Sequence, residues 1–268
     1  MSDANQDEKF LRHLSRHLVS LGCVHAPASA ADPNEEKWFF TSGFVMEVRG
    51  VWFLVTAGHV LEDISKQMTR HPDRRYRFMI ADSFGDKADY PDPIPIDYTG
   101  TPKHFVYDEN GGMDFGLMLL NDNCRQLLER NKVEPLREAK LRPSDDLECF
   151  MYCMIGFPNQ SMAIERPGHL RLEVDLIPLE RLTTAPGALF RQTAPMFYGK
   201  ISRLPDGYSI KGMSGCPILG FAKHGEDIRY HFIAVQSGWL PDSKIIYAGM
   251  VSDLAGMLGE AIDRAASG

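Results

Sequence analysis

The feature that most constrains this chain is a succession of short apolar and β-branched runs separated by clusters of Gly, Pro and Asp. This punctuation favours an all-β barrel or sandwich over alternating βαβ units. In the first half the runs cover 38–48, 51–55, 76–80, 94–98 and 115–120. In the second half they cover 147–155, 170–177, 196–201, 216–221, 230–236 and 245–251. We therefore expect an antiparallel all-β protein.

Helical patterns interrupt the strands. Apolar residues recur at helical spacing over 7–21, and an Ala- and Pro-rich stretch at 26–34 reads as a linker. Strong helix formers fill 124–134, and 252–266 carries apolar residues at four-residue steps. We expect an N-terminal helix, a helical connection in mid-chain and a C-terminal helix, with only one short helical turn at 60–64.

Composition excludes several classes. The chain has 268 residues, 44% hydrophobic and 24% charged, as in an ordinary globular protein. A net charge of −7 argues against nucleic acid as a partner. No signal peptide and no run of about 18 apolar residues is seen, so we expect no membrane association. Five cysteines without framework spacing favour a reducing cytoplasm.

Two pairs of residues invite a metal interpretation. Cys149 and Cys153 lie four apart, and His13 and His17 lie one helical turn apart. Neither pair has a matching second pair at zinc-site spacing. We therefore expect neither a metal nor a cofactor.

A small-residue turn, Gly212-Met213-Ser214-Gly215-Cys216-Pro217, is the strongest chemical signal. Flanking glycines let a backbone turn tightly around an exposed hydroxyl while amide hydrogens converge behind it. A serine nucleophile needs a basic histidine and an orienting carboxylate. His59 follows one apolar run and Asp114 opens another. An α/β-hydrolase elbow is disfavoured, because position 216 is not glycine and the acid and base precede the serine.

Three blocks carry a resemblance. Thr56-Ala57-Gly58-His59, Asp114-Phe115-Gly116-Leu117 and Gly212–Pro217 resemble, in order and spacing, the histidine, aspartate and serine blocks of trypsin-like (chymotrypsin-fold) serine proteases. Thr41-Ser42-Gly43-Phe44 is similar to a block of bacterial members, and the cysteine pattern suggests an intracellular type. The resemblance implies two six-stranded antiparallel β-barrels. It also implies a Ser214–His59–Asp114 triad, with the backbone N–H groups of Gly212 and Ser214 as the oxyanion hole.

Pattern and resemblance together divide the chain into five parts. We expect the N-terminal helix and linker at 1–35, a first barrel with the histidine and aspartate at 36–120, and a connection at 121–146. A second barrel with the serine then covers 147–251, and a C-terminal helix covers 252–268. A regulatory partner could dock on the N-terminal helix.

Departures from the family pattern bear on activation and specificity. Met213 replaces the aspartate that pairs with a new N-terminus in zymogen-activated members, so that route should be closed. Cys216 replaces a glycine, and we expect it to pack in the core. The resemblance puts Tyr208 at the base of the primary pocket, which favours a shallow or small-to-apolar pocket over one for Arg or Lys. It also puts Ser237 on an edge strand that pairs with substrate.

The sequence thus predicts an intracellular serine endopeptidase of narrow specificity that acts on a protein or peptide. The alternative is a catalytically silent peptide-binding or scaffold protein on the same fold.

Overall fold

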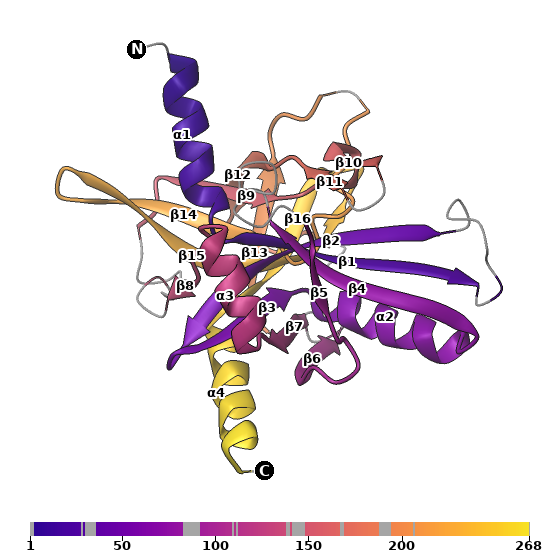
Figure 1. The fold of residues 1–268 in the computed structure, drawn as a ribbon. Coiled ribbons are helices and arrows are strands. Elements are labelled where there is room, and N and C mark those ends of the chain that lie inside the picture. The colour runs from indigo at the N-terminus through magenta and orange to yellow at the C-terminus, as the bar shows by residue number, and fades with distance from the viewer. Residues whose placement is uncertain are drawn as a thin grey trace.

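A computed structural model describes residues 3–27, 29, 36–82, 92–108, 110, 112–137, 140, 148–166, 169–187, 194–205 and 207–267. Two β structures pack against each other, and helices α1 (Asp3–Ser15) and α4 (Val251–Ser267) extend from them in opposite directions (Figure 1). Most of the predicted linker and residues 141–147 of the predicted connection lie outside the described residues.

The first half of the chain forms an eight-stranded sheet. Seven strands lie in the order β5-β4-β1-β2-β3-β7-β6, and β8 pairs in parallel with β2. Their bounds are β1 Leu18–Pro27, β2 Lys37–Val48, β3 Val51–Thr56, β4 Arg74–Asp82, β5 Ile94–Ile96, β6 Lys103–Asp108, β7 Met113–Leu119 and β8 Leu136–Arg137. The prediction of a closed six-stranded first barrel is therefore wrong, since this sheet is larger and its strand path is open.

Among the strands that we did not predict, β1 lies where we expected the end of a helix. Helix α1 ends at Ser15, and Leu18 and Leu21 are fully buried strand residues. β1 pairs with β2 on one side and β4 on the other, with Leu21 opposite both Thr41 and Ile80. Pairing on both edges satisfies its backbone groups, which outweighs a helix-like spacing of leucines. The range 1–35 thus holds a central strand as well as a helix.

The second half forms a closed six-stranded barrel, which confirms the prediction for this half. Its strands run in the order β12-β13-β16-β15-β14-β9. Their bounds are β9 Met151–Gly156, β12 Asp175–Leu182, β13 Met196–Ile201, β14 Pro217–His224, β15 Asp227–Leu240 and β16 Ile245–Met250. The predicted strand at 170–177 is instead split between β12 and a separate hairpin, β10 (Met162–Arg166) with β11 (His169–Leu172).

Two helices between the strands differ from expectation. Helix α2 runs over Gly58–Arg70, well beyond the single turn predicted at 60–64, because its apolar face continues from Ile64 to Met68, which packs against the same hydrophobic cluster. Helix α3 covers Asp122–Arg130, and its N-cap Asn121 accepts a hydrogen bond from the Cys124 N–H at 2.9 Å. It ends before the predicted Glu134, because the chain turns at Lys132 with a positive φ of 64°.

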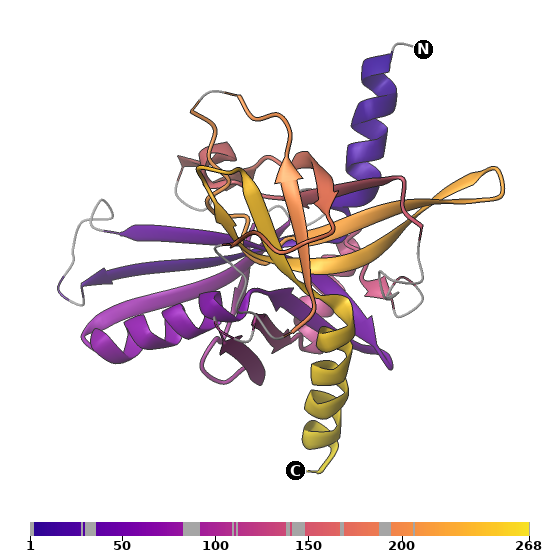
Figure 2. The ribbon, with the colours of Figure 1, turned by 180° about the vertical axis from the view of Figure 1, so that it is seen from behind.

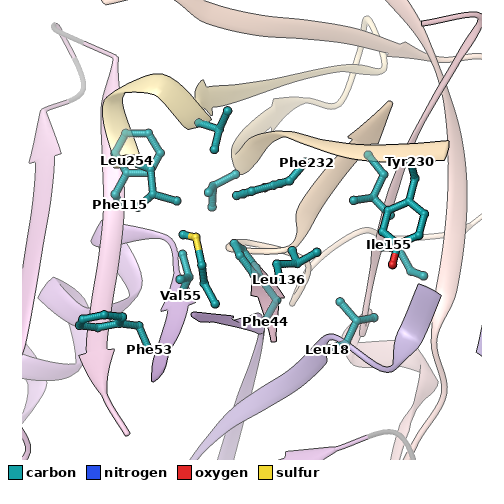
Figure 3. Close-up of a cluster of buried hydrophobic side chains, with 14 of the residues drawn as sticks. Leu18, Phe44, Phe53, Val55, Phe115, Leu136, Ile155, Tyr230, Phe232 and Leu254 are labelled. Carbon is teal, nitrogen blue, oxygen red and sulfur yellow. The ribbon is translucent and has the colours of Figure 1, made fainter. Parts of the chain in front are cut away.

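A shared hydrophobic core joins the two halves (Figure 3). Phe44 of β2 meets Phe232 of β15 edge to face, with ring centroids 4.8 Å apart. Phe115 of β7 and Leu254 of α4 are fully buried in the same cluster. Burial of each such side chain contributes roughly 1.5–3 kcal/mol. This core fixes the halves against each other and therefore fixes any site built between them.

Long strands leave the core on opposite sides. β1, β2 and β4, with α2 alongside, extend one way, and the β14–β15 hairpin extends the other way (Figures 1 and 2). Among the described residues, no helix is long and apolar enough to cross a bilayer.

Candidate active site

The structure brings His59 and Asp114 into direct contact. His59 lies in the first turn of α2, and Asp114 is the second residue of β7. Asp114 Oδ2 lies 2.7 Å from His59 Nδ1, and Asp114 Oδ1 accepts a hydrogen bond from the His59 backbone N–H at 2.8 Å. One buried carboxylate therefore orients the imidazole and also satisfies a free amide at the start of the helix.

The surroundings of His59 shift its acidity in opposing ways. Burial disfavours the imidazolium, but the hydrogen bond and charge of Asp114 favour it, and Asp63 and Glu62 add to this. The net effect is a pKa of His59 above its usual value. Its side chain remains 25% exposed, against 6% for Asp114, so the ring is still reachable from solvent.

Ser214 and His59 line the same cavity. A cavity of about 570 Å³ is lined by His59, Val60 and Asp63 of α2, by Ser214 and its neighbours Ile210 to Gly212, and by Gln236, Gly238 and Trp239 of β15. Residues of β1, β2 and β4 close its far side. The predicted nucleophile and base thus share one solvent-accessible space.

Hydrogen bonds from both halves hold the serine turn. Ser42 N donates to Gly212 O at 2.8 Å, and Thr41 Oγ1 donates to Ser214 O at 2.9 Å. From the barrel side, Gly215 N donates to Gln236 O at 2.8 Å. The turn therefore sits at the junction of the two halves and is bonded to each.

Two glycines give the turn its shape. Gly212 and Gly215 have φ values of 91° and 87°, which side chains rarely tolerate. A Cβ at Gly212 would lie 2.2 Å from Asn159 Oδ1, and one at Gly215 would lie 2.2 Å from Thr56 Oγ1. Both positions therefore require glycine for backbone conformation and for space.

The amide groups of this turn divide into two kinds. Two of them are hydrogen-bonded within the protein: Met213 N donates to Ile210 O at 3.1 Å, and Gly215 N donates to Gln236 O. Within the described part of the chain, no hydrogen bond is made by the N–H groups of Gly212 and Ser214. These two donors are therefore free for an external oxygen, which is what an oxyanion hole needs.

Met213 and Cys216 point away from the chemistry. Both are fully buried in the hydrophobic cluster of the second barrel. Burial raises the pKa of the Cys216 thiol far above neutrality. The expected packing role of Cys216 agrees with this environment.

Tyr208 contacts the first residue of β12. Its hydroxyl donates a hydrogen bond to Asp175, which begins β12, and burial with this contact raises the pKa of the phenol. Tyr208 does not line the cavity, whose barrel-side wall is formed by Ile210, Lys211, Gln236, Gly238 and Trp239. The assignment of Tyr208 to the base of the primary pocket therefore remains a prediction from the resemblance.

Ser237 lies next to the histidine–aspartate pair. It lines a smaller cavity of about 170 Å³ with His59, Asp114 and Tyr107. It occupies a register shift between Gln236 and Gly238, and β14 pairs with β15 only as far as Val235. The segment from Ser237 onward thus has β16 on one edge and no strand on the other within the described residues. An open edge of this kind can pair with an extended peptide.

Sequence reasoning missed several residues of the cavity. Gln236 was not predicted as a site residue, although side chains alternate along a strand, so that Gln236 and Ser237 face opposite ways. Lys211 and Asn159 carried no motif, and α2 was predicted too short to bring Asp63 and Gln67 to the cavity.

The metal alternatives find no support in the geometry. Both ring nitrogens of His17 are occupied, Nδ1 by Glu134 O at 2.6 Å and Nε2 by the Tyr230 hydroxyl at 2.7 Å. None of the five cysteines forms a disulfide bond. The described residues contain no group of three or more His, Cys, Asp or Glu side chains placed to hold a metal.

Comparisons with known proteins bear on the fold. No protein-family model and no curated relative matches the sequence. The structure is similar to a scabies mite inactivated protease paralogue, S-I1, with a TM-score of 0.52 and 15% identity over 94% of this chain and 97% of that one. A TM-score of 0.47 relates it to protease Anisep from Arthrobacter nicotinovorans, 14% identical over 88% of this chain and 90% of that one. Tobacco vein mottling virus protease also has a TM-score of 0.47 and is 9% identical, over 90% of this chain and 79% of that one. With its closed barrel and second antiparallel sheet, the chain has the trypsin-like serine protease fold.

Proposed function

We propose that this protein is a serine endopeptidase that cleaves peptide bonds through an acyl-enzyme intermediate on Ser214. The observation that carries the proposal is the two-point contact of Asp114 with His59 on the cavity that Ser214 also lines. A histidine held by a buried carboxylate beside a serine in a glycine turn is the arrangement that activates a hydroxyl.

Each residue has a defined role in the proposed reaction. His59 takes the Ser214 proton as the hydroxyl attacks the substrate carbonyl, and Asp114 stabilises the resulting imidazolium. The Gly212 and Ser214 N–H groups bind the oxyanion, each worth on the order of 10²–10³ in rate. His59 then protonates the leaving amine, and water releases the acyl group by the same steps in reverse.

The cysteines near the site favour serine over cysteine as the nucleophile. Cys23 lines the cavity, but burial raises its pKa to about 11, so its thiol stays protonated near neutral pH. Cys216 is fully buried. Iodoacetamide should therefore leave activity intact, and inactivation by alkylation of Cys23 would contradict a serine mechanism.

Substrate would bind as an added strand. The open edge of β15 from Ser237 onward borders the cavity at Gly238 and Trp239. Main-chain pairing there would place a carbonyl near Ser214 whatever the side chains, which leaves specificity to the cavity walls.

A silent binding or scaffold protein is the second candidate. One observation favours it: the similar scabies mite structure is described as an inactivated protease paralogue, so this fold does not by itself establish activity. In the present chain His59, Asp114 and Ser214 are all retained, which favours the enzyme. The expectations of cytoplasmic location, a regulatory partner on α1 and no nucleic acid remain predictions.

The two candidates separate in a cleavage assay. Digestion of a proteome-derived peptide library by the wild-type chain should yield products that Ser214→Ala does not yield. Ser243→Ala, which changes an exposed serine in the β15–β16 turn, is the matched control and should cleave normally. Peptide binding by wild type and Ser214→Ala alike, with no products from either, would favour the silent candidate.

A further inference from the structure

Gln236 has a buried polar group without a partner. The residue is only 2% exposed, and its Oε1 atom accepts no hydrogen bond from the described residues. Buried polar side-chain atoms in folded proteins are paired in the large majority of cases. A side chain left unpaired beside a binding cavity is therefore a candidate for pairing with a ligand.

The position of Gln236 is fixed by the serine turn. Its backbone N–H donates to Cys216 O at 3.0 Å, and its carbonyl accepts from Gly215 N at 2.8 Å. These bonds tie Gln236 to Gly215 and Cys216, the two residues directly after Ser214. Gln236 also lines the cavity together with Ile210, Gly238 and Trp239. Its carboxamide is thus held in the barrel-side wall, close to the nucleophile.

The proposed reaction assigns this wall to one part of the substrate. His59 protonates the leaving amine, so the leaving part of the peptide lies on the His59 side, along α2 and β2. The acyl part, whose carbonyl Ser214 attacks, then lies on the opposite side, against the barrel. The side chain of the acyl-side residue faces the wall that contains Gln236.

We propose that Gln236 selects the acyl-side residue and favours an uncharged hydrogen-bond donor, with glutamine and asparagine preferred. This inference rests on the proposed endopeptidase function. A carboxamide both donates and accepts, so a substrate carboxamide can satisfy Gln236 and itself be satisfied in return. An aliphatic side chain would leave the Gln236 oxygen unpaired, as it is in the free protein, and would gain no hydrogen bond there, so the carboxamide is favoured over it.

The charges of the wall disfavour basic residues. No carboxylate is present among Ile210, Lys211, Gln236, Gly238 and Trp239, and Lys211 adds a positive charge. Asp63 is on α2, on the leaving-group side. Burying Lys or Arg against an amide alone would leave its charge unpaired. This replaces the small-to-apolar preference expected from Tyr208.

Cleavage-site profiling tests the inference. A proteome-derived peptide library is digested, and the residue before each cut is counted by mass spectrometry. For wild type we expect Gln and Asn to be the most frequent residues before the cut. Gln236→Met keeps a similar side-chain size and removes the amide. In this variant the preference for a substrate Gln over a substrate Met before the cut should fall by about 10- to 100-fold. Gln126→Met, the same change at an exposed position of α3 outside the cavity, should keep the wild-type profile.

A second variant guards against loss of folding. Gln236→Glu places a carboxylate in the wall and should create cleavage after Lys or Arg. Thermal unfolding shows that each variant is folded, and fluorophosphonate labelling of Ser214 reports the nucleophile separately. An unchanged profile in a folded, labelled Gln236→Met or Gln236→Glu would overturn the role of Gln236. No labelling and no cleavage in wild type would instead overturn the proposed function.

Discussion

Asp114 contacts His59 at two points, through Oδ2 to the ring Nδ1 at 2.7 Å and through Oδ1 to the backbone N–H at 2.8 Å. The same carboxylate therefore sets the tautomer of the base and anchors the first turn of α2, on which the base lies. Strand β7 carries Asp114, and the neighbouring Phe115 is fully buried in the core between the two halves. Packing of that core thus controls the geometry of the proposed base.

Replacing Asp114 by Asn should impair catalysis far more than folding. The amide can still occupy the space, but it favours the wrong imidazole tautomer and cannot stabilise the imidazolium. We expect kcat to fall by about 10⁴. Steady-state kinetics on a substrate found by library digestion measures this. Turnover within tenfold of wild type in Asp114→Asn would show that His59 does not depend on Asp114.

The pH profile should show a raised histidine pKa. Only neutral His59 can accept the Ser214 proton, so kcat/KM should rise with pH through the pKa of the free enzyme. Because Asp114 raises that pKa, the midpoint should lie above about 6.5. Asp63→Asn removes a smaller contribution and should shift the midpoint slightly downward. An acid limb that does not move in Asp63→Asn, or that lies well below 6.5 in wild type, would contradict this account.

His17 should make stability depend on pH. Burial lowers its pKa to about 4, outweighing the hydrogen bond to Glu134 O, while in the unfolded chain it is about 6.5. Between these values the unfolded chain binds more protons, so stability rises with pH and is lost as pH falls from 6.5 toward 4. For this one group, the free energy of unfolding should change with pH by up to about 1.4 kcal/mol per pH unit.

Urea unfolding midpoints measured from pH 7 to pH 4 would show this contribution. His17→Gln should flatten the dependence in that range, even though it also lowers stability at pH 7. His224→Gln, at an exposed position on the β14–β15 hairpin, is the matched control and should retain the wild-type slope. Equal slopes in the His17 and His224 variants would exclude the buried imidazole as the cause.

Met213 should resist replacement by the aspartate of zymogen-activated proteases. It is fully buried among apolar residues of the second barrel, so Met213→Asp would bury an unpaired carboxylate. We expect Met213→Asp to lower the free energy of unfolding by at least about 3 kcal/mol, and Met213→Leu to lower it by less than about 1.5 kcal/mol. Chemical denaturation compares the two. Equal stability of both variants would mean that position 213 is accessible to a charged partner.

Removal of the N-terminal residues should not activate the protein. Removing residues 1–36 would delete β1, which lies between β2 and β4 in the first sheet. We therefore expect such a fragment to misfold. Activity gained on this truncation would contradict both the strand assignment and the absence of an N-terminal salt-bridge switch.

The sequence predicted best what is local. Alternating apolar runs and turn residues located most strands of the second barrel. The turn at Ser214 could be predicted because its positive φ angles require glycine at positions 212 and 215. The contact of His59 with Asp114 was predicted from the resemblance, since 55 residues separate them and no local pattern connects them.

The failures have physical causes. Leu18 and Leu21 fit a helical stripe as well as a strand, and the choice was made by pairing with β2 and β4, which are distant in sequence. Gln236 escaped notice because an unpaired buried amide is visible only once its neighbours are in place.

The most direct test of the central claim is covalent labelling of Ser214. A fluorophosphonate reacts with a serine only when a base activates it and an oxyanion site accepts the phosphoryl oxygen. Intact-protein and peptide mass spectrometry should show one adduct on Ser214 in wild type, none in Ser214→Ala and much slower labelling in His59→Ala. An unlabelled wild-type protein, or an adduct that forms as fast in His59→Ala, would contradict the proposed catalytic site.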